Sequence, residues 1–255
     1  MIGIIFAAGI GSRLKPFTDY HPKALAEING VPILIRVAQK LLDAGARRLI
    51  VNLHHFPQQI KDCISNQSFS SLVEYSDETD LLLDTGGALA KIAAESNTIK
   101  TADGSEPVIV HNSDIYTDFA LADMISAHKQ NGSDATILVD YHRSSSRHFL
   151  FDALNRLQAW ENTSTGIIRP EGIDAQQFKA GAFGGVHLLT PSIISKIGRF
   201  PNKMICPFSI TDWYIDNCDK YSIKAYTPLS DFYWFDIGTP EKLKEANEAL
   251  QTLKP

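Results

Sequence analysis

Residues 2–23 read IGIIFAAGIGSRLKPFTDYHPK, an apolar run followed by a long loop of small residues, cations and prolines. The run from Gly3 to Phe6 predicts a buried β-strand, and Gly9 and Gly11 follow it closely. Glycines in this place let the backbone approach a ligand and point its N–H groups at a phosphate. The stretch therefore predicts a phosphate-binding loop after the first strand.

Two common types of phosphate loop do not fit this stretch. A dinucleotide-binding loop needs a third glycine and a helix that starts at the glycines, but Leu14 and Pro16 stand where that helix would run. Proline inside a helix costs about 3 kcal/mol. A Walker loop needs Gly-Lys-Ser/Thr, which is absent. A long irregular loop that carries two cations, Arg13 and Lys23, remains.

Short apolar runs alternate with helical patterns through the first half of the chain. We expect strands at 49–53, 72–75, 108–110 and 135–139, and helices at 32–44, 57–64, 87–95 and 118–128, the last capped by Asp118. Continuous apolar strands between helices predict a parallel sheet covered on both faces. Ligands of such sheets bind beyond the carboxyl ends of the strands.

The pattern changes after about residue 145, where we expect a hairpin within 149–160, strands at 182–189, 222–226 and 232–235, and helices at 191–197, 211–219 and 239–250. No linker, repeat or low-complexity tract separates the two parts. We therefore expect a single domain over residues 1–255, with halves 1–145 and 146–255 that share one sheet.

The composition is that of an ordinary soluble globular protein, with 44% hydrophobic and 21% charged residues. A net charge of −5 argues against a nucleic-acid partner, because such proteins usually carry a basic face. Three scattered cysteines predict neither a disulfide framework nor a zinc site. No signal peptide or membrane-crossing stretch is visible, so a cytoplasmic protein without a membrane partner is expected.

The loop resembles the signature of the sugar-phosphate nucleotidylyltransferase family, in the order Ala7-Ala-Gly-x-Gly-x-Arg13-x-x-Pro16-x-Thr18-x-x-x-Pro22-Lys23. The resemblance spans nearly the whole chain. It implies a Rossmann-like, three-layer α/β/α fold with a mostly parallel, mixed central sheet. It also implies that Ala8, Gly9 and Gly11 contact the nucleotide, and that Arg13 and Lys23 bind its phosphates.

Asp84-Thr85-Gly86-Gly87-Ala88 resembles the family's segment at the nucleobase, which implies nucleotide contacts by Thr85, Gly86 and Gly87. Two glycines would let the backbone face a flat ligand. Thr85 could also cap the helix that follows, and one segment can serve both purposes.

Two carboxylates are candidates for Mg²⁺, which takes one or two protein carboxylates plus phosphate oxygens. Asp114 directly follows an apolar strand, and Asn112-Ser-Asp114 resembles the family's Asn-Gly-Asp segment, whose aspartate binds Mg²⁺. The same resemblance places Asn112 at the nucleotide. Asp236, in Trp234-Phe-Asp236-Ile-Gly-Thr-Pro, resembles the second Mg²⁺ ligand. Spacing alone does not bring the two aspartates together; the resemblance supplies that link.

Phe183-Gly184-Gly185-Val186-His187 resembles the family's sugar-binding strand, which implies sugar contacts at Gly184 and Gly185. His187 is expected to be a packed histidine rather than a catalyst. Many relatives carry Glu-Lys-Pro shortly before this strand, with the lysine on the sugar phosphate. The nearest equivalents here are Arg169 and Lys179, so the residue that would bind the sugar phosphate stays unassigned.

The resemblance implies a Mg²⁺-dependent enzyme that transfers a nucleoside monophosphate from an NTP to a sugar 1-phosphate and releases pyrophosphate, with Arg13, Lys23 and Asp114 as catalytic residues. Residues 1–145 would bind the nucleotide and 146–255 the sugar. The segments 51–60 and 83–87 look closest to N-acetylmuramic acid α-1-phosphate uridylyltransferases of cell-wall recycling, which favours UTP and N-acetylmuramic acid 1-phosphate.

Several alternatives stay open. Mannose-1-phosphate guanylyltransferases share much of the pattern, and glucose-1-phosphate uridylyl- or thymidylyltransferases are further candidates. A non-catalytic nucleotide-sugar sensor on the same fold is the alternative from another class of protein. The sequence leaves the nucleobase and the sugar open, and a monomer or a small homo-oligomer is expected.

Overall fold

The computed structural model describes residues 1–102, 104–199 and 205–252. The strands of its main sheet are β1 (Ile2–Phe6), β4 (Arg48–Leu53), β5 (Val73–Asp77), β6 (Val108–Asn112), β8 (Ala135–Asp140), β9 (Arg147–Phe151), β10 (Leu157–Asn162), β11 (Ile167–Arg169), β12 (Lys179–Leu189) and β13 (Ile223–Tyr226). Two small sheets pair β2 (Glu27–Ile28) with β3 (Val31–Pro32), and β7 (Ile115–Thr117) with β14 (Trp234–Asp236). The helices are α1 (Ile33–Asp43), α2 (Pro57–Ser65), α3 (Asp84–Glu95), α4 (Asn97–Lys100), α5 (Leu121–Asn131), α6 (Pro191–Ile197), α7 (Ile210–Asn217) and α8 (Pro240–Thr252).

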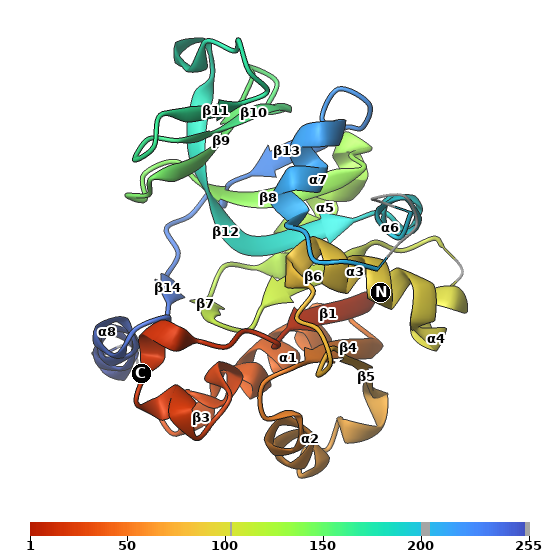
Figure 1. Cartoon of the computed structure of the whole chain (residues 1–255), viewed down its shortest axis with the longest axis vertical. Coiled ribbons are helices and arrows are strands. Elements are labelled where there is room, and N and C mark those ends of the chain that lie inside the picture. The colour runs from red at the N-terminus through yellow and green to blue at the C-terminus, as the bar shows by residue number, and fades with distance from the viewer. Residues whose placement is uncertain (103, 200–204, 253–255) are drawn as a thin grey trace.

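The main sheet is mixed, with the order β11-β10-β9-β12-β6-β1-β4-β5, and β8 pairs with both β12 and β13 (Figure 1). Its parallel part is β6, β1, β4 and β5. Within it, Phe6 lies opposite Asn52 on one side and Asn112 on the other. The carboxyl ends of β1, β4 and β6 therefore meet at one edge, where the loop after β1 begins.

Three of the parallel strands, β1, β4 and β6, are buried on both faces. Ile5, Val51 and Ile109 pack into a cluster with residues of α1, α2 and α5. Ile4 and Ile50 pack on the opposite face with residues of α3, α6 and α7. The predicted α/β class, with a mixed central sheet flanked by helices, is confirmed.

β12 joins the two halves of the chain. Its end, Val186–Leu189, runs antiparallel to β6, whereas its start, Lys179–Gly181, pairs with β9. Figure 1 shows β9, β10 and β11 at one end of the molecule and β12 running from there to the parallel strands. The predicted hairpin is confirmed as β9 and β10.

Two predicted helix starts are wrong. α5 begins at Leu121, because the carboxylate of Asp118 instead accepts the N–H of Tyr233 at 2.7 Å. α3 begins at Asp84 rather than Gly87, and Thr85 does not cap it, because its hydroxyl accepts the N–H of Ile210 at 3.0 Å. Both side chains serve contacts with distant parts of the chain.

None of the helices in the described ranges has both the length and the apolar character needed to cross a membrane. The helices instead cover the sheet with one apolar side. In α1, the buried positions are Ile33, Leu34, Val37, Ala38 and Leu41, a spacing of three or four residues.

Shortening a buried leucine of α1 should destabilise the fold. Leu41→Ala removes a side chain that is 0% exposed and is expected to lower the free energy of unfolding by about 2–5 kcal/mol. Leu154→Ala is the control, because Leu154 is 74% exposed and its loss should change that free energy by about 0.5 kcal/mol or less. Urea unfolding measures both. Equal losses in the two variants would contradict the packing described for α1.

Candidate active site

The loop after β1 folds back on itself through three short 3-10 helices, Ser12–Leu14, Phe17–Asp19 and Lys23–Leu25. Gly11 starts the first of them with a φ of 68°, in the left-handed region that favours glycine. A Cβ at Gly11 would lie 2.9 Å from the Cβ of Lys23 and 2.9 Å from Cγ2 of Thr18. The Thr18 hydroxyl also donates to the carbonyl of Gly11 at 2.9 Å. Gly11 thus allows the turn that brings Lys23 back to the end of β1.

Lys23 lies at the centre of the site and is 8% exposed. Its Nζ donates to Oδ2 of Asp114 at 2.5 Å and lies 4.0 Å from Oδ1 of Asp236. A buried ammonium needs paired anions, because an isolated buried charge is very costly. The structure therefore brings together three residues that the sequence predicted for the site.

Backbone pairing explains how two distant aspartates meet. β14 runs antiparallel to β7, with Asp236 opposite Ile115. The N–H of Ile237 donates to the carbonyl of Asp114 at 3.0 Å. Asp114 immediately precedes β7 and Asp236 ends β14, so the pairing holds both carboxylates at one rim.

Asp236 has further partners from the turn and helix that follow it. Lys242 of α8 donates to its Oδ2 at 3.0 Å, and the N–H of Gly238 donates to its Oδ1 at 2.8 Å. Burial by itself raises the pKa of Asp236, but the hydrogen bond from Lys242 and the charge of Lys23 outweigh it and hold the pKa below its ordinary value. Asp236 is therefore an anion at neutral pH.

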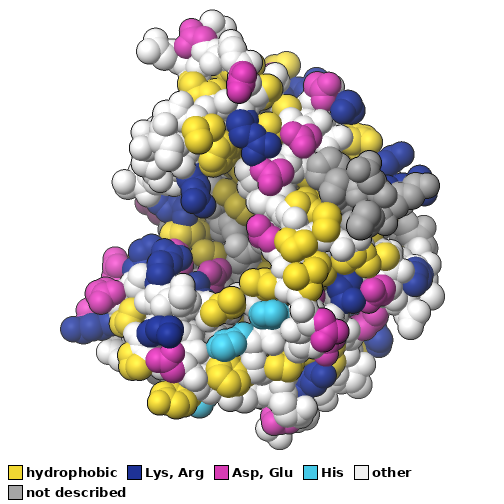
Figure 2. Space-filling view, viewed as in Figure 1, with side chains coloured by type: hydrophobic (Ala, Val, Ile, Leu, Met, Phe, Trp, Pro, Cys, Tyr) yellow, Lys and Arg dark blue, Asp and Glu magenta, His cyan; other side chains and the backbone are white. Residues whose placement is uncertain are grey.

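Arg13 lies on the same side of the site and is exposed. A Cβ at Gly238 would lie 3.1 Å from Nη2 of Arg13 and 3.3 Å from Nζ of Lys23. The two predicted phosphate-binding cations thus converge over Gly238. Figure 2 shows the molecule hollowed between the end that carries β9–β11 and the part that carries α8, with Lys and Arg side chains along the rims.

A cavity of about 360 Å³ adjoins Lys23 and Asp114, within the size range of small-molecule sites. Five predicted nucleotide-binding residues line it, namely Ala8, Gly9, Lys23, Thr85 and Asn112. The other lining residues are Phe6, Ala7, Asn52, Glu78, Leu82, Asp84, Ser113 and Asp114. A Cβ at Gly9 would meet nothing within 4 Å, so the backbone there faces open space.

Asn52 and Glu78 form a buried network in the wall of this cavity that our sequence analysis missed. Oδ1 of Asn52 accepts the N–H groups of Ala7 at 2.6 Å and Ala8 at 3.2 Å. Its Nδ2 donates to Glu78 at 2.9 Å, and Glu78 accepts the N–H of Leu83 at 3.2 Å. Burial, only partly offset by these hydrogen bonds, raises the pKa of Glu78. A polar Asn52 within the apolar run 49–53 was the available signal.

Gly86 and Gly87 lie against another segment of the chain. The N–H groups of both donate to the carbonyl of Phe208, at 2.9 and 3.2 Å. A Cβ at Gly86 would collide with the ring of Phe208, and one at Gly87 with the carbonyl of Cys206. These glycines therefore make room for residues 206–208, and neither lines the cavity.

The predicted sugar strand adjoins the aspartates. Gly185 has a φ of 76°, and a Cβ there would lie 2.7 Å from Ile115 and 3.3 Å from Nδ2 of Asn112. The carbonyl of Gly184 accepts the indole N–H of Trp234 at 2.9 Å. Gly185 of β12 thus lies beside β7, which directly follows Asp114, and Gly184 lies beside β14, which ends at Asp236.

The two cations left open for the sugar phosphate have other partners. Arg169 donates to Asp212 of α7 at 2.5 Å and lies 3.7 Å from Asp216. The ammonium of Lys179 lies 3.5 Å from the ring centroid of Tyr141. Neither cation contacts Asp114 or Asp236 in the described structure.

Two histidines lie fully buried next to the site. His187 hydrogen-bonds the hydroxyl of Tyr214, and His111 the carbonyl of Asn112 at 2.8 Å. Burial lowers the pKa of His187 to about 3 and that of His111 to about 4. Both are neutral at pH 7, and the prediction that His187 is a packed residue is confirmed.

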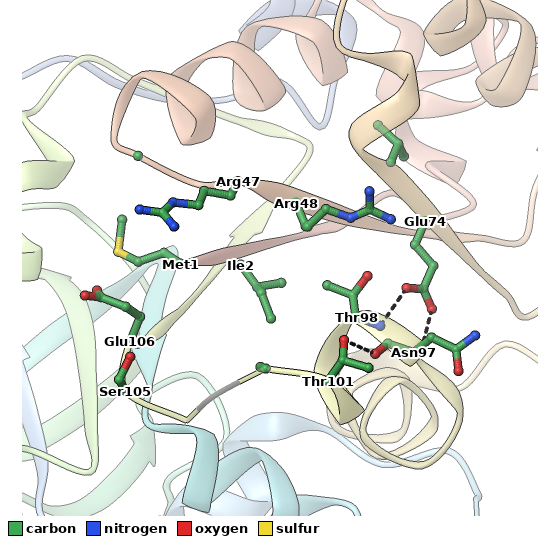
Figure 3. Close-up of a pocket in the computed structure, with 13 residues that line it drawn as sticks. Met1, Ile2, Arg47, Arg48, Glu74, Asn97, Thr98, Thr101, Ser105 and Glu106 are labelled. Carbon is green, nitrogen blue, oxygen red and sulfur yellow. Dashed lines mark hydrogen bonds between the residues drawn. The ribbon is translucent and has the colours of Figure 1, made fainter.

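A larger cavity, of about 860 Å³, lies at the opposite edge of the sheet (Figure 3). It is lined by Ile2 and Arg48, at the starts of β1 and β4. The carboxylate of Glu74 accepts the N–H groups of Asn97 and Thr98 at the start of α4. None of the predicted site residues lines this cavity.

The oxygen ligands of Asp114 and Asp236 suit a hard cation such as Mg²⁺. Both carboxylates already lie within 4.0 Å of one ammonium, which shows that positive charge is stabilised between them. Among the described residues, no group of three or more His, Cys, Asp and Glu side chains could hold a metal by itself. Mg²⁺ does not need such a group, since phosphate and water oxygens complete its shell.

Comparison with known proteins agrees with this geometry. Residues 2–149 match the nucleotidyl transferase family. The chain belongs to that family. The chain is 28% identical, over 242 residues, to the mannose-1-phosphate guanylyltransferase catalytic subunit beta of Drosophila melanogaster. It is 24% identical over 246 residues to the mannose-1-phosphate guanyltransferase of Schizosaccharomyces pombe.

These alignments cover 93% and 94% of this chain but 59% and 62% of those proteins. The chain thus spans about three fifths of the length of the curated relatives it matches.

Solved structures resemble the whole chain. HddC from Yersinia pseudotuberculosis, solved with GMP-PN, has a TM-score of 0.69 at 25% identity and covers 98% of this chain and 99% of its own. A putative glucose-1-phosphate thymidylyltransferase from Bacillus anthracis, solved with sucrose, has a TM-score of 0.76 at 19% identity, with coverage of 100% and 97%. The second likeness supports the fold alone.

The buried histidines should make the fold sensitive to acid. The pKa of His187 is lower in the folded than in the unfolded chain. Below about pH 6.5 the unfolded chain therefore binds more protons than the folded chain, and the free energy of unfolding decreases as the pH is lowered. Between pH 7 and 5, the wild type should lose about 2 kcal/mol more free energy of unfolding than His187→Gln. Urea unfolding at both pH values measures this difference. His142 is exposed, so His142→Gln is the control and should behave like the wild type. If the free energy of unfolding changed equally with pH in the wild type and in His187→Gln, the lowered pKa of His187 would be contradicted.

Proposed function

We propose that this chain transfers a nucleoside monophosphate from an NTP to a sugar 1-phosphate and releases pyrophosphate. The observation that carries the proposal is the convergence of Lys23, Asp114 and Asp236 beside a cavity of about 360 Å³, in a chain of the nucleotidyl transferase family. A nucleotide-sugar sensor would not need this set of charges. We treat residues 1–255 as a single domain, with the nucleotide on 1–145 and the sugar on 146–255.

The nucleotide is assigned to the cavity at the ends of β1 and β6. Ala8, Gly9, Thr85 and Asn112 would contact it there. Gly11, Gly86 and Gly87 would shape the site through the chain contacts that they permit. Arg13 would stabilise the departing pyrophosphate, and the sugar would lie along Gly184 and Gly185 of β12.

The reaction is an in-line displacement at the α-phosphorus. An oxygen of the sugar phosphate forms a bond to that phosphorus, and the bond from it to the oxygen shared with the β-phosphorus breaks. Pyrophosphate leaves with the bonding electron pair, and the product is an NDP-sugar. The second pKa of a phosphate monoester is about 6, so the attacking group is already ionised and needs no general base. The buried, neutral His111 and His187 are consistent with this chemistry.

Asp114 and Asp236 are the residues that would hold Mg²⁺. When bound, the ion would supply positive charge to the phosphate oxygens. Lys23 contacts both carboxylates and would neutralise the α-phosphate. The protein contributes mainly by positioning and by electrostatic stabilisation.

UTP and N-acetylmuramic acid 1-phosphate are the substrates we favour. This choice rests on the resemblance of the segments 51–60 and 83–87 to N-acetylmuramic acid α-1-phosphate uridylyltransferases. GTP with mannose 1-phosphate is a second candidate, supported by the guanylyltransferases among the relatives and by the GMP-PN bound to HddC.

A substrate matrix tests the proposal. The full chain is assayed for pyrophosphate release with UTP, GTP, dTTP and ATP against N-acetylmuramic acid, mannose and glucose 1-phosphates, with MgCl₂. We expect turnover, highest for UTP with N-acetylmuramic acid 1-phosphate. Higher turnover with GTP and mannose 1-phosphate would select the second candidate. If no substrate pair released pyrophosphate above the background, the proposed enzymatic activity would be refuted.

Asp114→Asn should abolish most of the activity without unfolding the chain. Asparagine keeps the size of the side chain but removes the charge that would face Mg²⁺ and Lys23, and losing one such transition-state contact typically costs 10²–10³ in rate. We expect kcat to fall at least about 100-fold. The control is Asp123→Asn, an exposed aspartate on α5. Near-normal kcat for Asp114→Asn at saturating Mg²⁺ would remove Asp114 from the site.

A further inference from the structure

An arginine after β8 lies on the sugar side of the site, and our sequence analysis did not single it out. The guanidinium carbon of Arg143 is 3.7 Å from the ring centroid of Trp234, a cation–π distance. Its Nη2 donates to the carbonyl of Phe183 at 2.5 Å, directly before the glycine pair of β12. Arg143 is therefore fixed between β12 and β14.

This position faces Asp236. Trp234 and Asp236 are alternate residues of β14, and alternate side chains of a strand point to the same side. The indole N–H of Trp234 donates to Gly184, so this side of β14 faces the predicted sugar strand. Burial lowers the pKa of Arg143, while the charges of Asp140 and Asp236 oppose that effect. Arg143 thus lies within electrostatic range of Asp236.

The guanidinium of Arg143 also has an N–H donor that is not hydrogen-bonded to any described residue. Arginine carries five N–H donors in a planar fork, which matches the geometry of a phosphate. Nε of Arg143 is buried and has no hydrogen-bond partner within the part of the chain that the structure describes. A buried donor without a partner costs free energy that a bound oxygen would recover.

Other cations near the sugar strand are less suited. Arg169 is paired with Asp212, and Lys179 lies over Tyr141, as described above. Lys242 is exposed and is bound to Oδ2 of Asp236. Arg143 alone among these four is held against both the sugar strand and the strand of Asp236.

We propose that Arg143, stacked on Trp234, binds the phosphate of the sugar 1-phosphate and holds it beside Asp236 for attack. This inference rests on the proposed function. The incoming phosphate carries nearly two negative charges and must approach two carboxylates and a triphosphate. Arg143 supplies a fixed positive charge on the sugar side, whereas Arg13 and Lys23 supply it on the nucleotide side.

The test is steady-state kinetics of the full chain with the best substrate pair from the matrix above. Arg143→Met keeps much of the apolar contact with Trp234 but removes the charge and the donors. A charge-assisted hydrogen bond is worth about 1.5–3 kcal/mol, so the KM for the sugar 1-phosphate should rise roughly 10- to 150-fold. The KM for the NTP should stay within about twofold. Arg147→Met, an exposed arginine of β9, is the matched control and should resemble the wild type.

A conservative variant separates binding from packing. Arg143→Lys keeps the charge but lacks the fork, so its KM for the sugar 1-phosphate should lie between those of the wild type and Arg143→Met. It also serves as the test if the methionine variant does not fold. A sugar 1-phosphate KM unchanged in both variants, or a rise shared equally by the NTP, would overturn the role of Arg143. Failure of the proposed function has a different signature, because the wild type itself would then show no turnover.

Discussion

The pairing of β7 with β14 is the constraint on which the candidate site depends. It joins Asp236, near the end of the chain, to the residues that follow β6, so that two carboxylates share one rim. Two neighbouring anions repel each other, and the ammonium of Lys23, within 4.0 Å of both carboxylates, offsets that repulsion. The fold therefore builds a strongly polar cluster into a largely buried position. A Mg²⁺-bound polyphosphate would be attracted to the same arrangement of charge.

Asn52 and Glu78 form a different kind of wall in the same cavity. There, Asn52 and Glu78 bind the backbone of Ala7, Ala8 and Leu83, and their hydrogen-bonding groups point inward to the protein. Burial raises the pKa of Glu78, and the hydrogen bonds from Asn52 and Leu83 oppose that effect. A wall whose polar groups are already hydrogen-bonded would suit a nucleobase, whereas the cations of the rim would suit phosphates.

Local patterns in the sequence predicted most of the helices and strands, but they did not predict contacts between residues far apart in the chain. α6 was predicted with its observed bounds, because Pro191 at its first turn and the spacing of its isoleucines are local signals. Asp118 and Thr85 looked like helix caps for the same local reason. Their side chains instead hold Tyr233 and Ile210, partners that no short window of sequence contains. The meeting of Asp114 and Asp236 was likewise implied only by the family resemblance.

The two sides of the site differ in how far a motif can define them. The proposed nucleotide side is made by loops at the carboxyl ends of adjacent parallel strands, and the motif after β1 supplies Ala8, Gly9 and Lys23 to it. The proposed sugar side combines a left-handed glycine in β12, an indole from β14 and a guanidinium that follows β8. Gly185 and Trp234 lie outside residues 2–149, the part that matches the nucleotidyl transferase family. The family can therefore be recognised from the first half, while the choice of sugar, on the function proposed above, would depend on contacts assembled across both halves.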